Sequence, residues 1–148
     1  MTSTDDRKRV ARQHIDLSWN KGRVALAEQL QSKDFLYKSS FMPGPLDGEG
    51  YREMVLKIRD AMPDLEVVVE ECIAEEAHVF TWCTLIGSIH KPALGYPPSD
   101  RILSISAMAF WTFNSRGEVQ EICTMFDMES FRAQLGLSNR AYAEKALP

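Results

Sequence analysis

The stretch EVQEICTMFDMESFRAQLG, residues 118–136, changes its hydrophobic period part-way along. Its first ten residues alternate as a β-strand does, which places Asp127 in phase with Cys123 and Met125. After Asp127 the apolar spacing becomes helical, and a glycine closes the stretch, as is typical of a helix end. The sequence therefore predicts a last strand that runs into a short helix, with Asp127 at the junction.

A lone carboxylate where a strand becomes a helix has two interpretations. In the first, Asp127 is an N-cap whose side chain accepts a hydrogen bond from the backbone amide of Ser130. In the second, Asp127 is a general base whose pKa is raised by the apolar side chains of Cys123 and Met125. Position alone favours the cap, because aspartate is among the commonest N-cap residues.

The rest of the chain predicts helices first and strands afterwards. Apolar residues recur at helical spacing in residues 4–20, 23–31 and 51–62. They alternate in residues 65–73, 79–89 and 101–113, and a short strand is expected at 35–37. Prolines and glycines make residues 42–50 a loop that could act as a lid.

This order of elements is typical of an α+β fold. We expect about three N-terminal helices to pack on one face of a curved, cone-shaped antiparallel sheet, with a short C-terminal helix after it. The open end of a cone is a natural apolar pocket. At 148 residues, the chain is expected to form one domain, residues 1–148.

Composition excludes several classes of function. A net charge of −4 without a basic face argues against nucleic-acid binding. No apolar run is long enough to span a membrane, and residues 1–6 are polar and unlike a secretory signal, so we expect a cytoplasmic protein. The three cysteines are expected to be free thiols. No spacing resembles a metal site or a phosphate-binding loop, so neither is expected.

Four patches in order carry a resemblance to a known family. They are Trp-Asn-Lys-Gly at 19–22, Met-Pro-Asp-Leu at 62–65, Gly-Tyr-Pro-Pro-Ser at 95–99, and the stretch at 118–136. Over about residues 12–136, with residues 138–148 as a tail, the chain resembles the SnoaL-like polyketide cyclases. The resemblance implies the cone fold shared with nuclear transport factors and ketosteroid isomerase, and it implies that Asp127 is the catalytic base.

The same resemblance implies a hydrophobic, polyketide-derived small-molecule substrate, chemistry without cofactor or metal, and a homodimer or higher homo-oligomer. Two positions depart from the family pattern. The second polar catalytic residue of many members is Ala109 in this chain. The histidine that follows the second strand is shifted by one residue to His90, which reverses its face unless the strand has ended.

Other candidate residues come from the residue pattern. Glu71 interrupts an apolar phase, so it is either a catalytic carboxylate or a residue that a bulge returns to solvent. His90 either polarises a carbonyl group or lies on the surface, and His14 on the core side of the first helix is expected to be structural. The candidate substrate-binding residues are Trp111, Trp82, Tyr37, Tyr51, Met54, Ala109, Cys123 and Met125.

Three functional hypotheses follow. The first is a cofactor-independent cyclase or isomerase of a polyketide-derived intermediate of secondary metabolism, with Asp127 as general acid or base in an apolar pocket. The second is a non-catalytic binding or chaperone-like module of the same fold, which Ala109 favours. The third is water activation by Asp127, as in an epoxide hydrolase, which usually needs a larger polar network. Asp127→Asn distinguishes the first two, since only an enzyme should lose turnover.

Overall fold

In the computed structural model, which describes residues 3–93 and 95–137, helices pack on one five-stranded sheet. The helices are α1 (Thr4–Ile15), its π-helical continuation η1 (Asp16–Asn20), α2 (Val24–Glu28), α3 (Gly48–Ala61) and α4 (Met128–Gln134). The strands are β1 (Gln31–Ser39), β2 (Glu66–Glu75), β3 (His78–Gly87), β4 (Leu103–Phe113) and β5 (Val119–Phe126). The tail expected at 138–148 lies outside the described residues.

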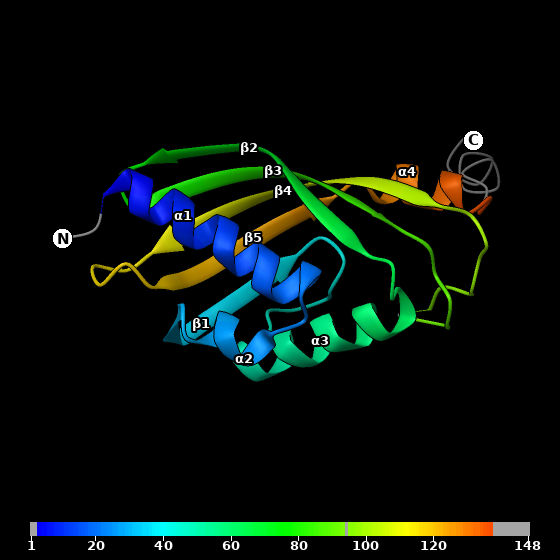
Figure 1. Cartoon of the computed structure of the whole chain (residues 1–148), viewed down its shortest axis with the longest axis horizontal. Helices are drawn as coiled ribbons and strands as arrows, with labels where there is room; N and C mark the ends of the chain where they lie inside the picture. The colour runs from blue at the N-terminus through cyan, green and yellow to red at the C-terminus, as the bar shows by residue number, and fades with distance from the viewer. Residues whose placement is uncertain (1–2, 94, 138–148) are drawn as a thin grey trace, which may run out of the picture.

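The sheet is curved, and α1, α2 and α3 lie together on one side of it (Figure 1). The short helix α4 lies at the end of the molecule opposite the N-terminus (Figure 1). The strand order is β1-β5-β4-β3-β2. The expected fold class is therefore confirmed: an α+β domain in which N-terminal helices cover a curved sheet and a short helix follows the last strand.

One edge of the sheet differs from the expected antiparallel arrangement. Strands β2 to β5 form the predicted antiparallel meander, but β1 pairs with β5 in parallel. Strand β1 is also longer than expected, because it begins at Gln31. Next to this edge, Tyr37 and Leu46 exchange two backbone hydrogen bonds of 2.8 Å, which tie the expected lid segment to β1.

Alternation along β4 defines two faces of the sheet. Its odd-numbered residues, from Leu103 to Phe113, are buried, whereas the even-numbered residues between them are exposed or half-buried. The antiparallel neighbours β3 and β5 continue both faces, because paired residues point to the same side of a sheet. We call the buried side the inner face and the other the outer face.

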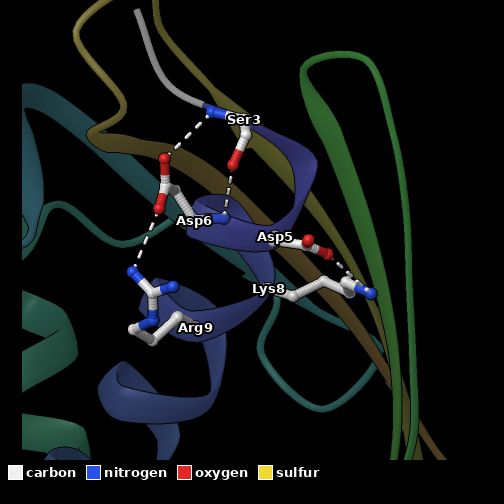
Figure 2. Close-up of polar contacts among 5 residues, drawn as sticks. All are labelled: Ser3, Asp5, Asp6, Lys8 and Arg9. Atoms are coloured by element: carbon white, nitrogen blue, oxygen red, sulfur yellow. Dashed lines mark hydrogen bonds and ion pairs between the residues drawn. The ribbon is translucent and has the colours of Figure 1, made fainter.

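A reciprocal cap begins α1 (Figure 2). The Ser3 hydroxyl accepts a hydrogen bond from the Asp6 amide, and the Asp6 carboxylate accepts one from the Ser3 amide, both at 3.1 Å. Arg9 also donates to Asp6 at 3.0 Å, and these bonds, chiefly those from Ser3, hold the pKa of the Asp6 carboxyl below its usual value. This capping box fixes where α1 starts, and so which of its residues face the sheet.

The last turn of the first helix is tied to β2. The Asn20 side-chain amide donates to the Val67 carbonyl at 3.0 Å, and its oxygen accepts from the Val67 amide at 2.7 Å. Arg59 on α3 donates to the Trp19 carbonyl, and Gly22, with a φ of 65°, turns the chain out of the helix. These contacts hold Trp19 over the inner face.

Candidate functional site

An apolar cavity lies between the inner face of the sheet, α3 and α4. It has a volume of about 90 Å³, and its wall consists of aliphatic and aromatic residues. They are Trp19, Phe41, Ile58, Met62, Leu65, Leu85, Ile89, Ala93, Tyr96, Ile105, Phe126, Met128 and Phe131. Edge contacts fix several of these rings, with centroids 4.7 Å apart for Tyr96 and Phe131. We call this space the outer cavity.

A second space, the inner cavity, continues it under α1. Its volume is about 40 Å³. Its wall is formed by His14, Ile15, Trp19, Tyr37, Tyr51, Val67, Thr81, Cys83, Leu85, Ala107, Ala109, Trp111, Ile122, Thr124 and Phe126. Trp19, Leu85 and Phe126 belong to both walls, so the two cavities adjoin inside the cone. Of the predicted substrate-binding residues, Trp111, Tyr37, Tyr51 and Ala109 line the inner cavity, and their contact with substrate stays a prediction.

The inner cavity carries polar groups that its outer counterpart lacks. The Trp111 indole donates to the Thr81 hydroxyl at 2.9 Å. Burial raises the pKa of Tyr37 to about 12 and that of Cys83 to about 11, and it raises the pKa of Tyr51 as well. These groups therefore keep their protons at neutral pH, where they act as hydrogen-bond donors and not as bases.

His14 is the remaining titratable group of the inner cavity wall. It is completely buried, as expected for a core-facing residue of the first helix. Its Nε2 lies 2.8 Å from Oε1 of Gln31 at the start of β1. Burial lowers the pKa of His14 to about 4, and the hydrogen bond to Gln31 offsets only part of this effect, so the ring is neutral at pH 7.

Asp127 caps α4. Its Oδ1 accepts a hydrogen bond from the Ser130 amide at 3.0 Å, so the cap interpretation is confirmed. Asp127 is exposed, but it lies between Phe126 and Met128, which both line the outer cavity. Asp127 itself lines neither cavity, one of its oxygens is engaged in the cap, and its role as a base stays a prediction.

The prediction that Cys123 and Met125 form an apolar wall around Asp127 is wrong. Cys123 and Met125 are exposed on the outer face, and Met125 is 69% exposed. The opposite phase of β5 faces inward, because Ile122 and Thr124 are buried against the helices and Phe126 lines both cavities. Asp127 does not follow the alternation of β5, because the strand ends at Phe126. The direction of the Asp127 side chain is set by its hydrogen bond at the start of α4.

Two more predicted substrate-binding residues lie elsewhere. Trp82 is 40% exposed on the outer face, paired with Met108, because β3 turns Thr81 and Cys83 inward. Met54 is buried in the hydrophobic core and lines neither cavity, as the packing stripe of an amphipathic helix usually does. Neither side chain is therefore placed to contact a ligand inside the cone.

Glu71 and His90 also lie outside the cavities. A bulge between Val69 and Glu71 leaves Glu71 exposed on the outer face, so the solvent interpretation is confirmed. Strand β3 ends at Gly87, and His90 is exposed, with Nε2 2.9 Å from the Ser88 hydroxyl. These positions contradict a catalytic role for either residue within the cone.

Most residues of the outer cavity wall were not among the predicted substrate-binding residues. Phe41 and Tyr96 come from irregular segments whose sequence carries no period. Phe131 had a signal, because it lies on the apolar face of the helix that follows Asp127. Phe126 also carries a signal, since it alternates with Ile122 and Thr124, but the prediction places the other phase of β5, with Cys123 and Met125, at the pocket.

A sequence model of one family, described as SnoaL-like polyketide cyclase, matches residues 8–135. The chain belongs to this family. The match spans all the described helices and strands except the first few residues of α1, so both cavities lie within the SnoaL-like domain. No curated protein matches the chain.

Several solved structures share the SnoaL-like fold. A candidate SnoaL-like polyketide cyclase from Jannaschia sp. CCS1 is 20% identical, with a TM-score of 0.80 over 90% of this chain and 95% of that one. AclR from Streptomyces galilaeus, a candidate hydroxylase, is 20% identical, with a TM-score of 0.79 over 92% and 88%. IdmH from Streptomyces antibioticus, a candidate polyketide cyclase, is 20% identical, with a TM-score of 0.72 over 84% and 94%. At these identities the likeness establishes the fold.

Residues 3–93 and 95–137 of this SnoaL-like chain lack two features, a metal-binding cluster and a membrane-spanning helix. Within these ranges, no cluster of three or more histidine, cysteine, aspartate or glutamate side chains is arranged to hold a metal ion. No helix in the same part of the chain has the length and apolar character needed to cross a membrane.

Proposed function

We propose that this protein is a cofactor-independent cyclase or isomerase that acts on a polyketide-derived intermediate. The observation that carries the proposal is the pair of adjoining cavities, whose outer part is apolar and whose inner part is lined by neutral hydrogen-bonding groups. Such a site can hold a flexible apolar substrate in one folded conformer and exclude water, and both effects lower the barrier to ring closure.

Asp127 is the proposed acid–base group. Family membership favours this role, and its place between two residues of the outer cavity wall is compatible with it. Among the described residues, no hydrogen bond engages its Oδ2, so one carboxylate oxygen is available while the other caps α4. An apolar substrate that covers this carboxylate would displace water from it, and a carboxylate without its water shell is a stronger base.

A variant that fills the inner cavity tests the proposal. Ala109 is 9% exposed on the cavity wall, and Ala109→Leu adds three carbon atoms there. In a source strain that lacks the gene, we expect an uncyclised precursor to accumulate, wild-type protein to restore the product, and Ala109→Leu to lower product formation by roughly 10- to 100-fold.

Ala133→Leu is the matched control, because Ala133 is exposed on α4 and the same three carbon atoms enter solvent. Circular dichroism of both purified variants shows whether they are folded, since overpacking costs about 1–3 kcal/mol. If folded Ala109→Leu restores the product as well as Ala133→Leu does, the inner cavity is not a substrate site.

A non-catalytic binding module is the second candidate. The exposure of Asp127 and the alanine at position 109 favour it, because a cone without acid–base chemistry still offers an apolar cavity. The two candidates differ in the effect of Asp127→Asn, which should abolish turnover in an enzyme and leave a binding protein unchanged.

A homodimer or higher oligomer is also part of the proposal. Apolar side chains lie side by side across the outer face, where Trp82 pairs with Met108 and Met108 pairs with Met125. Their exposed fractions are 40%, 49% and 69%, and Phe110 beside them is 51% exposed. A contiguous exposed apolar patch of this kind marks interaction surfaces.

We therefore expect Met108→Glu to shift the protein toward monomers, because it buries a charge in the proposed interface. Size-exclusion chromatography with light scattering measures the change. Ile102→Glu is the control, since Ile102 is 75% exposed but precedes β4 and lies outside the patch. A wild-type protein that is monomeric at all concentrations would contradict this part of the proposal.

A further inference from the structure

His14 carries an unused hydrogen-bond acceptor inside the cone. Its Nε2 lies 2.8 Å from the side-chain oxygen of Gln31, and an amide oxygen can only accept. The ring proton is therefore on Nε2, and Nδ1 carries a lone pair. Nδ1 is completely buried, and no group in the described part of the chain forms a hydrogen bond with it.

The surroundings of the ring explain why no protein group satisfies Nδ1. The ring lies among Phe35, Tyr51 and Trp111 in tilted and edge contacts, with centroid distances of 6.2, 5.5 and 5.4 Å. The Trp111 indole N–H is already donated to Thr81. His14 lines the inner cavity whereas Gln31 does not, so a ligand in that cavity would meet a part of the ring that the bond to Gln31 leaves free.

A buried acceptor without a donor is a costly feature, because its solvation is lost and nothing replaces it. The apolar outer cavity offers no group that could reach it. A hydrogen-bond donor on a molecule bound inside the cone would satisfy it. A neutral histidine can accept such a hydrogen bond at Nδ1. Because burial lowers the pKa of His14 to about 4, this lone pair is available over the whole neutral pH range.

We propose that Nδ1 of His14 accepts a hydrogen bond from a hydroxyl group at the inner end of an apolar ligand. The proposal rests on the proposed function in that the ligand occupies the two cavities. It adds a requirement on that ligand: a hydroxyl group at the end that enters the cone first. A ketone or an ether at the same point would place an acceptor against an acceptor and would bind more weakly.

Two probes that differ at this hydroxyl group test the proposal. They are 2-naphthol, which can donate a hydrogen bond, and 2-methoxynaphthalene, which cannot. Titration calorimetry gives the ratio of their affinities for each protein variant, and comparison between variants removes the difference in their hydrophobicity. One neutral hydrogen bond corresponds to a change in this ratio of roughly five-fold.

Two substitutions separate the two nitrogen atoms of the ring. His14→Gln keeps a donor for Gln31 and lacks an acceptor at Nδ1, whereas His14→Asn places an oxygen close to the position of Nδ1. We expect His14→Gln to lower the preference for 2-naphthol by roughly five-fold and His14→Asn to keep most of it.

In wild-type protein labelled with ¹⁵N-histidine, 2-naphthol should move the Nδ1 resonance to lower frequency, and 2-methoxynaphthalene should not.

The possible outcomes are distinct. If both probes bind and neither shifts the Nδ1 resonance, then water or nothing supplies the donor, and the inference is overturned while the cavity remains a ligand site. If His14→Gln is folded and keeps the wild-type affinity ratio, the inference is likewise overturned. If neither probe binds wild-type protein, the cavity itself fails as a ligand site, and both the proposed function and this inference are contradicted.

Discussion

Asp127→Asn is expected to lower turnover by roughly 10²- to 10⁴-fold, the usual contribution of a general acid or base. The free energy of unfolding should stay within about 0.5 kcal/mol of wild type, because asparagine caps a helix about as well as aspartate does. The side-chain oxygen can still accept the hydrogen bond from Ser130 that now caps α4. Single-turnover kinetics and urea unfolding of the same preparation measure the two quantities.

A second cap in the chain provides the control. Asp47 caps α3, and its Oδ1 accepts a hydrogen bond from the Gly50 amide at 2.8 Å. Asp47 is exposed and lines neither cavity. Asp47→Asn makes the same chemical change and should leave both turnover and stability unaltered. If the two asparagine variants are equally active, Asp127 is a cap alone, and the acid–base role belongs to another group or to none.

Acid is expected to destabilise the protein through His14. The pKa of this histidine is about 4 in the folded chain and 6.5 in its ordinary state, so the unfolded chain binds the additional proton between these values. The contribution of neutral, buried His14 is therefore fully present above pH 6.5 and is lost as the pH falls toward 4. The size of the loss is about 3 kcal/mol, from 1.36 kcal/mol for each pKa unit.

The pH dependence of unfolding in wild type and His14→Gln measures this effect. Glutamine does not titrate and keeps a donor for Gln31, so the variant should have a flatter profile between pH 4 and 6.5. Tyr37, Tyr51 and Cys83 line the same cavity, but burial raises their pKa values, so they stay neutral throughout this range. Parallel profiles for the two proteins would show that protonation of His14 does not lower the free energy of unfolding, and would contradict this prediction.

Local periodicity was enough to predict the helices and the antiparallel strands. The stripe of α3 is an example, because Tyr51, Met54 and Val55 recur at helical spacing and all three are buried. The parallel pairing of β1 with β5 could not be predicted in this way, since Tyr37 and Ile122 are far apart in sequence and only the folded sheet brings them together.

The site was predicted less completely than the fold. Both phases of β5 contain apolar residues, so alternation alone does not tell which phase the helices cover. Family resemblance drew attention to Asp127 and to the set that contains Cys123 and Met125, whereas Phe126 is the residue that lines both cavities. His14 was assigned correctly to the core, but its free Nδ1 depends on Gln31, a partner that only the tertiary structure reveals.

The central claim is that the ligand binds inside the cone. Intermolecular nuclear Overhauser effects between 2-naphthol and methyl groups of the protein test it most directly. We expect contacts to Leu85, which lines both cavities, and to Ile105 of the outer cavity. Contacts to the exposed methyl groups of Met108 and Met125, without any to Leu85 or Ile105, would place the ligand on the outer face and contradict the account.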